Sequence, residues 1–399
     1  MNLVPLPVTA IRLRTALPFS VYDEGGRLVL AKGSLVTSEL QRQHLIQRGG
    51  FIDETESEHF QRALAGKLDD LVRQNVPLKQ LATATPDHLG PPALPEKPTD
   101  PASMWSELQV RASALLRETQ REDWLPRLLK LQADVLEQVD RDADAALFLL
   151  IQSTSTEVRS YSATHALLVT VVCELAARCL PVWDEPMRLS LRCAALSMNL
   201  AMTHLQDRLS QQDQAPDPEQ RQHLRRHPER TAAMLRAAGV LDALWLDAVA
   251  QHHSAPPGPL AARLPADQLA RVIQRCDIFA ARLSARAKRR ALSATAAAQA
   301  IYTDELKQPD EAGGAIIKAV GLYPPGSFVR LGNGEVAVVL ARGKRANEPR
   351  VASIVGREGM PLGEPAPRDT RLPAFHTTGG VAPHEVKVTL NLERMLKLR

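Results

Sequence analysis

The sequence has few aromatic residues, no long apolar run and only a small net charge. Phe, Trp and Tyr make up 4% of its 399 residues, although apolar residues as a whole make up 44%. With alanine and leucine dominant, this composition favours packed helices over sheets. Because no apolar run approaches 18 residues and the N-terminus has no apolar signal segment, we expect neither membrane insertion nor secretion. The net charge of +4 gives no reason to expect a nucleic-acid partner.

Cysteine is scarce, and several catalytic motifs are missing. The four cysteines contain no CxxC pair and all lie in the central part of the chain: Cys173, Cys179, Cys193 and Cys276. We interpret them as buried thiols of a protein in the reducing cytoplasm. No P-loop, dinucleotide-binding glycine motif or GxSxG elbow occurs in the sequence. These absences argue against the common nucleotide-binding and serine-hydrolase mechanisms.

Proline is concentrated in one segment and marks the main domain boundary. Six prolines fall between residues 83 and 101, where they would prevent a continuous helix. We therefore predict a mainly α-helical protein, with a helical bundle between two small modules. The predicted parts are a small N-terminal α/β module at 1–53, a helix and proline-rich linker at 54–101, the helical domain at 102–320 and a β-rich module with a tail at 321–399.

Both flanking modules carry turn signals. In the first, strands at 19–22 and 27–30 are separated by Asp23-Glu24-Gly25-Gly26, and a helix capped by Thr37 or Ser38 should follow. A short strand is expected at 51–52. In the second, Gly332-Asn333-Gly334 predicts a hairpin between strands 327–331 and 335–340. A third strand is expected at 351–355, and the tail 386–399 should dock as a strand or a helix.

The central region shows the periodicity of packed helices. Residues 165–177 are apolar on nearly every side, which predicts a buried central helix. Helices are also expected at 241–253 and 269–290, whereas 207–222 is polar, contains prolines and should be a loop or a loose helix. These segments carry side chains that commonly bind metals: His165, His227, His252, His253 and Asp277. Adjacent histidines on a helix point about 100° apart. The His252–His253 pair can therefore converge only if the backbone bends there; otherwise the two residues would address different ions.

The order and spacing of these residues resemble the HD-GYP family, a branch of the HD metal-dependent phosphohydrolases that cleaves cyclic di-GMP. The matching segments are Tyr161-Ser162-Ala163-Thr164-His165, His227-Pro228-Glu229, Gln251-His252-His253-Ser254, and Cys276-Asp277-Ile278-Phe279-Ala280 with Arg286. The segment from Tyr323 to Glu335 is also similar to one found in that family. The resemblance implies that the central region is an HD-type helical bundle. It also implies a bacterial signalling protein whose pocket receives a cyclic dinucleotide and whose histidines and Asp277 hold divalent metals.

The sequence departs from the family at its central motif. Where the family has AALLHDIGK, the chain has Met198-Asn199 in place of His-Asp. A thioether is a poor ligand for hard cations, and Asn199 offers a neutral oxygen in place of a bridging carboxylate. Tyr161 stands where some members have an acidic ligand, and Ser254-Ala255-Pro256-Pro257-Gly258 replaces the GYP loop. Two-metal hydrolysis should therefore lose several orders of magnitude in rate.

Each candidate residue has two interpretations. His227, His252 and His253 could hold one divalent transition metal, Fe or Mn, or could line a polar pocket without metal. His165 and Asp277 could belong to a second metal site or could hydrogen-bond each other. Arg286 could bind a ligand phosphate or could belong to a solvated basic helix end.

Three hypotheses about function follow. The first is a degenerate, catalytically impaired HD-GYP-like signalling protein whose helical domain is a binding or interaction module. The second is an active metal-dependent phosphohydrolase that acts on cyclic di-GMP or another phosphoester. The third is a scaffold that binds other signalling proteins through its helical surface. Whether the protein is an enzyme depends on what Met198 and Asn199 leave of the site.

Overall fold

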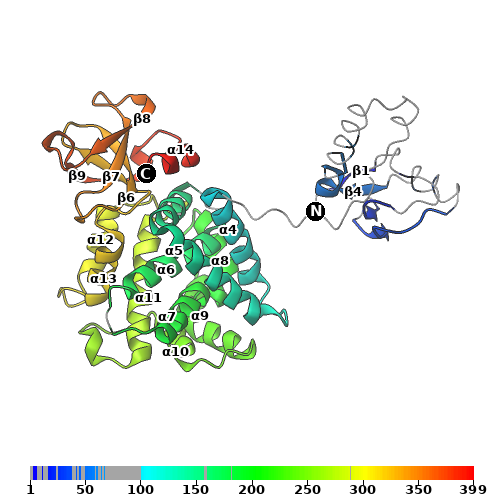
Figure 1. Cartoon of the computed structure of the whole chain (residues 1–399). Helices are drawn as coiled ribbons and strands as arrows, with labels where there is room; N and C mark the ends of the chain where they lie inside the picture. Colours follow the sequence, from blue (N-terminus) through cyan, green and yellow to red (C-terminus); the bar gives the residue numbers. More distant parts are fainter. Residues whose placement is uncertain are drawn as a thin grey trace. The chain divides into compact units, whose positions relative to one another are not determined.

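A computed structural model of the chain describes residues 3–6, 11, 17–23, 26–37, 42, 45, 50–58, 60–61, 64, 67 and 100–399, except 157–159, 181 and 288. The chain divides into two compact units, Met1–Lys97 and Pro98–Arg399 (Figure 1). Nearly all of the predicted proline-rich linker lies outside the described residues. Among the residues that the structure describes, no helix is long and apolar enough to cross a membrane.

The N-terminal unit contains a small antiparallel sheet. Its strands are β1 (Leu3–Pro5), β2 (Val21–Tyr22), β3 (Leu28–Leu30) and β4 (Phe51–Asp53), in the order β1-β4-β2-β3. The expected hairpin is confirmed by β2 and β3, and the short strand by β4. Phe19 and Phe60 pack edge to face, with ring centroids 5.7 Å apart, and anchor the apolar core of this unit. The predicted helix after Thr37 lies largely outside the described residues.

Helices form the body of the second unit, which confirms the predicted fold class. They are α4 (Pro101–Arg117), α5 (Trp124–Thr156), α6 (Tyr161–Ala177), α7 (Glu185–Ser197), α8 (Thr203–Gln211), α9 (Pro218–Ala237), α10 (Ala243–Gln251), α11 (Pro265–Leu283), α12 (Ala294–Tyr302) and α13 (Glu311–Val320). Helix α6 is buried along its whole length, as its apolar sequence predicts, and it packs against α4, α5, α7, α11 and α13. Helix α8 also contacts α6, whereas α10 packs beside α7 and α9, and α12 packs on α11 and α13.

Helix α5 is broken at Asp142, where the backbone is extended. The Asp142 carboxylate accepts a hydrogen bond from the backbone N–H of Ala145 at 3.0 Å, as an N-cap residue does. The same carboxylate also pairs with the guanidinium of Arg399, with Nη1 and Oδ2 2.8 Å apart. One aspartate therefore starts the second half of α5 and ties the end of the chain to the helical body.

Two sequence predictions about these helices are wrong in their bounds. Helix α11 ends at Leu283, not at residue 290, because the amides of Ala285 and Ala287 donate to the carbonyls of Thr154 and Ser210 on other segments. Arg286 and Arg289 therefore lie in a turn, not on a basic helix end. The region 207–222 is more helical than expected, since Asp217 and Gln220 form a capping box that starts α9.

The C-terminal part folds into a five-stranded antiparallel sheet at one end of the helical body, beside α12 (Figure 1). Its strands are β5 (Phe328–Leu331), β6 (Val336–Ala341), β7 (Arg350–Val355), β8 (Pro361–Asp369) and β9 (Thr377–Val381), in the order β8-β7-β6-β5-β9. The predicted hairpin and third strand are confirmed. The tail ends in a short helix, α14 (Leu392–Lys397), which buries Met395.

Candidate metal centre

His227 projects from the middle of α9, and the residue after it fixes its ring. Its Nδ1 lies 2.8 Å from the carbonyl oxygen of Leu224. In a regular helix that carbonyl would accept from residue 228, but residue 228 is proline and has no N–H. Because a carbonyl only accepts, Nδ1 carries the ring proton and the neutral Nε2 is left with a lone pair.

His252 is held in the same way at the end of α10. This helix ends at Gln251, so the carbonyl of Val249 has no helical partner and accepts from His252 Nδ1 at 2.7 Å. The backbone turns immediately, with the N–H of Ser254 bonded to the oxygen of Gln251 at 2.8 Å. The expected bend at the histidine pair is therefore confirmed.

The two fixed rings point their lone pairs at each other. Nε2 of His227 and Nε2 of His252 lie 3.3 Å apart, and neither carries a proton in this tautomer. Two nitrogens bound tetrahedrally to one ion at 2.0–2.1 Å would be separated by about 3.3 Å. Ligand atoms of His227, His252 and His253 all lie within 4.8 Å of one another. The donor set and its spacing fit a single transition-metal ion.

Burial keeps this pair neutral. Desolvation lowers the pKa of His227 to about 4 and that of His252 to about 3. At neutral pH both rings therefore present free lone pairs. His253 is exposed, and its ring lies edge-on to His227 and tilted against His252, with centroid distances of 5.0 Å and 4.2 Å. It opens one side of the cluster to solvent.

His165 and Asp277 form a second group beside the three histidines. His165 Nε2 lies 2.8 Å from Asp277 Oδ1, as one of the two expectations for this pair had it. Burial opposes ionisation of Asp277, but the His165 hydrogen bond and the charges of His165, His252 and His253 hold its pKa well below the usual range. The carboxylate is therefore ionised, and it acts electrostatically on the other histidines.

Tyr161 and Arg286 cover the outer side of this pair. The Tyr161 ring stacks on His165, with centroids 5.4 Å apart and planes 12° from parallel. Arg286 lies over the Tyr161 ring, 4.9 Å from its centroid, and its Nη2 donates to the Tyr161 hydroxyl at 2.7 Å. Some members of the HD-GYP family have an acidic metal ligand at the position of residue 161. In this chain the residue is a tyrosine, and its hydroxyl accepts a hydrogen bond from Arg286.

Met198 and Asn199 follow α7 directly. Met198 is buried and packs in the main apolar core. Asn199 precedes the 3-10 turn Leu200–Met202, which packs against α9, the helix that carries His227. The Oδ1 atom of Asn199 is buried and has no hydrogen-bond partner among the described residues. A buried oxygen without a hydrogen-bond donor suits a bound cation or water, and this oxygen lies next to the turn that packs against α9.

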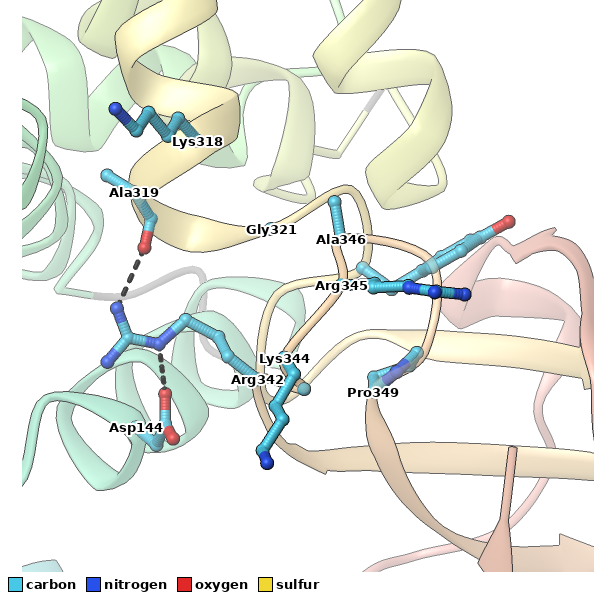
Figure 2. A pocket seen from close by; sticks show the side chains of 11 residues that line it. Asp144, Lys318, Ala319, Gly321, Arg342, Lys344, Arg345, Ala346 and Pro349 are labelled. Atoms are coloured by element: carbon cyan, nitrogen blue, oxygen red, sulfur yellow. Dashed lines mark hydrogen bonds and ion pairs between the residues drawn. The ribbon is translucent and has the colours of Figure 1, made fainter. Parts of the chain in front are cut away.

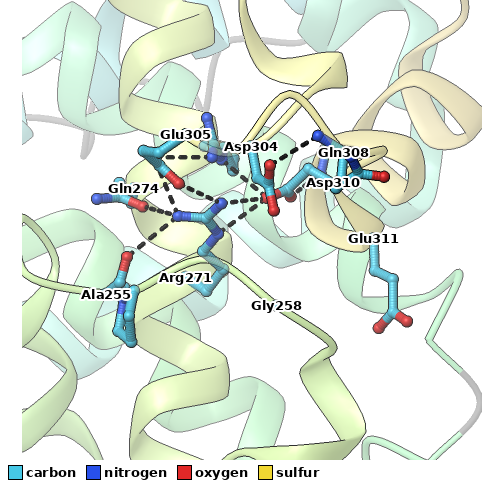
Figure 3. Close-up of polar contacts among 12 residues, drawn as sticks. Ala255, Gly258, Arg271, Gln274, Asp304, Glu305, Gln308, Asp310 and Glu311 are labelled. Atoms are coloured by element: carbon cyan, nitrogen blue, oxygen red, sulfur yellow. Dashed lines mark hydrogen bonds and ion pairs between the residues drawn. The ribbon is translucent and has the colours of Figure 1, made fainter.

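The segment after His253 is held by a buried ion-pair network (Figure 3). Arg271 on α11 donates to the Ala255 carbonyl at 3.1 Å and pairs with Asp310 and Glu305 from the α12–α13 region. Gln274 reaches the carbonyl of His253 at 3.5 Å. The sequence motifs include Pro228, but neither its effect on the His227 ring nor the role of Arg271 was predicted. For Pro228, the feature in the sequence that indicated its role is its position directly after a candidate metal ligand.

No family model matches the chain. The chain is 26% identical over 328 residues to "Cyclic di-GMP phosphodiesterase PA4108" of Pseudomonas aeruginosa, which covers 76% of this chain and 78% of the relative. A solved structure, "Bd1817, a HDG"Y"P protein from Bdellovibrio bacteriovorus", matches with a TM-score of 0.45 at 15% identity, covering 79% of this chain and 99% of that one.

The chain is therefore similar, over about three quarters of its length, to a curated cyclic di-GMP phosphodiesterase. The order of its motifs resembles that of the HD-GYP family.

Proposed function

We propose that the protein is an HD-GYP module that holds one divalent transition metal and binds a cyclic dinucleotide without hydrolysing it efficiently. The observation that supports one ion is the facing pair of Nε2 atoms on His227 and His252, with His253 beside them. An imidazole-rich set suits Fe(II) better than Mn(II), which prefers carboxylate and water oxygens. The ion would supply positive charge for a ligand phosphate.

A second ion beside the first lacks the negative charge that it needs. Two dications about 4 Å apart repel each other by roughly 16 kcal/mol at an effective dielectric constant of 20. A bridging carboxylate offsets this repulsion, but residue 199 is a neutral amide. The one acid of the candidate set, Asp277, is engaged by His165. The charge count therefore favours a mononuclear site.

The proposed ligand is cyclic di-GMP, the substrate named for the curated relative. Such a ligand carries two phosphodiester charges and would gain from a metal ion and a nearby guanidinium. Arg286, held against Tyr161, is the proposed phosphate contact, and its Nε has no hydrogen-bond partner among the described residues. Tyr161 would orient this guanidinium.

The second candidate function is hydrolysis of cyclic di-GMP or another phosphoester at a one-metal site. The intact His165–Asp277 pair favours it, because an ionised carboxylate with a hydrogen-bonded histidine can accept or deliver a proton near bound water. With no second cation, such a reaction would lack the clamp on both the attacking and leaving oxygens.

The test is calorimetric binding of cyclic di-GMP to the metal-loaded protein, together with chromatographic detection of linear products. We expect saturable binding that weakens about tenfold in Arg286→Gln, with no product above background. Arg357→Gln, an exposed arginine in the C-terminal sheet, serves as the matched control. Product formation that disappears in His252→Ala would support the second function and overturn the first.

A further inference from the structure

A basic hollow lies where the C-terminal sheet meets the helical body (Figure 2). It has a volume of about 390 Å³ and is formed by the end of α13, by Asp144 of α5, and by the segment between β6 and β7. We call it the basic hollow. Its charged lining residues are Asp144, Lys318, Arg342, Lys344 and Arg345. It shares no residue with the histidine cluster.

Positive charge dominates the lining. Four cationic side chains face a single carboxylate, which leaves a net charge of +3 (4 − 1). Lys318 and Lys344 are exposed and form no hydrogen bond or ion pair with any residue that the structure describes. Arg345 pairs with Glu348 at 3.1 Å on the exposed side of the loop. Two ammonium groups of the basic hollow are therefore free to meet an anion.

Arg342 directly follows strand β6 of the sheet and is held by two hydrogen bonds to the helical body. Its Nε binds Asp144 of α5, and its Nη1 donates to the carbonyl of Ala319 at 2.8 Å (Figure 2). The second of these contacts also satisfies a carbonyl at the end of α13, which would otherwise repel an anion. The Nη2 atom has no partner among the described residues. A guanidinium held in place with one free edge is a suitable phosphate donor.

The loop that carries Lys344 and Arg345 is tightly turned. A Cβ atom built on Gly343 would lie 1.7 Å from the carbonyl oxygen of Glu348, so only glycine permits this close approach. The turn brings the two basic side chains to the rim without an additional helix or strand. A preformed rim lowers the entropy cost of binding a small ligand.

We propose that the basic hollow binds a small phosphate-bearing molecule. Its volume falls within the range of small-molecule pockets, and its cations come from two segments, α13 and the segment between β6 and β7, that border a concave space. A nucleic acid would instead require an extended basic stripe, and the net charge of the chain is only +4. Ligand bound here would contact both the helical body and the sheet.

The test is calorimetric titration of the full chain with inorganic pyrophosphate and, separately, with ADP. We expect one saturable site for pyrophosphate, weakened about tenfold by Lys344→Gln and by Lys318→Gln. Arg357→Gln, an exposed arginine in the β7–β8 turn, should leave the affinity unchanged. His252→Ala should also leave it unchanged, which separates this site from the proposed metal centre.

The comparison between the two probes identifies what the basic hollow recognises. Tighter binding of ADP than of pyrophosphate would show that a nucleoside adds contacts, and equal binding would show recognition of phosphate alone; both support the proposal. Absence of saturable binding would overturn it. Equal weakening by Lys344→Gln and Arg357→Gln would overturn it too, because that result indicates general surface attraction. Retained melting temperatures of the variants confirm that each is folded.

Discussion

The Nε2 atoms of His227 and His252 lie 3.3 Å apart, and each ring has its Nδ1 against a backbone carbonyl oxygen. Both Nε2 lone pairs therefore point into the same small space. Burial lowers the pKa of each ring, so neither Nε2 is protonated at neutral pH. Such an arrangement is costly unless a cation lies between the rings. The preorganised pair is the physical basis for the proposed metal centre.

Pro228 should control the metal affinity of His227. Pro228→Ala restores an N–H that competes for the Leu224 carbonyl, so the Nδ1 proton loses its fixed partner. We expect metal affinity to fall by about 10–100-fold. The free energy of unfolding of the metal-free protein should rise by about 1–3 kcal/mol, because a proline leaves the helix interior. Chelator competition and urea unfolding measure the two effects.

Glu229→Ala is the matched control for Pro228, since Glu229 is the next residue on the same helix and is exposed. It should change neither quantity appreciably. If Pro228→Ala kept full metal affinity, the proline would have no role in orienting the ring.

Restoring the central dipeptide should create a second metal position. In Met198→His/Asn199→Asp, a carboxylate and an imidazole return to the turn that packs against α9. We expect the bound metal to rise from one ion to two per chain and hydrolysis of cyclic di-GMP to appear. Asn199→Asp alone should tighten the first ion, because it adds one negative charge. Elemental analysis and product chromatography provide the readouts, and a double variant that remains at one ion would argue against the charge explanation.

Two adjacent glycines in α13 should respond in opposite directions to alanine. A Cβ atom on Gly313 would lie 1.8 Å from the carbonyl oxygen of Ile301, whereas one on Gly314 would meet nothing within 4 Å. We expect Gly313→Ala to destabilise the protein by about 3 kcal/mol or more through overpacking. Gly314→Ala should stabilise it by up to about 1 kcal/mol, because alanine favours helix. Chemical denaturation tests this, and equal effects of the two substitutions would contradict the close approach of α13 to α12.

Stability should depend on pH through Glu335 in the C-terminal sheet. The hydrogen bond from Arg368, followed by that from Ser353, lowers the pKa of Glu335 to about 2, against the desolvation caused by burial. Because the folded-state pKa lies below the ordinary value of 4.5, ionised Glu335 stabilises the fold above pH 4.5. This contribution, on the order of 3 kcal/mol, is lost as pH falls from 4.5 through about 2.

Denaturation of Glu335→Gln between pH 5 and pH 2 should therefore show a flatter dependence than the unmodified protein. Glu358→Gln, an exposed carboxylate in the β7–β8 turn, should keep the original slope. If stability of Glu335→Gln depends on pH as steeply as that of the unmodified protein, the Glu335–Arg368 pair is not the cause of the dependence.

The strands of the C-terminal sheet illustrate what sequence patterns can predict. The inner strands β5, β6 and β7 are rich in valine, and glycines mark the turn between β5 and β6, so all three were predicted within one residue of their observed ends. The two strands that the sequence did not predict, β8 and β9, lie at the edges of the sheet. Strand β8 contains three prolines and β9 two glycines, and such residues are tolerated only where part of the backbone needs no ladder partner.

The sequence motifs indicated which histidines to examine together, but not the tautomers of their rings. The histidines and Asp277 were identified from motif order, and the bend at His252 from the geometry of adjacent residues. The end of α11 was missed because carbonyls of distant segments capture the amides of Ala285 and Ala287. Tertiary hydrogen bonds of this kind leave no local pattern in the sequence.

The most direct test of the central claim is the metal content of the protein, measured by elemental mass spectrometry after loading with Fe(II) and removal of loosely bound ions. We predict one ion per chain, and we expect it to be lost in His252→Ala. It should be retained in His223→Ala, which alters an exposed histidine on the same helix as His227. Two ions per chain, or no retained ion at all, would contradict it.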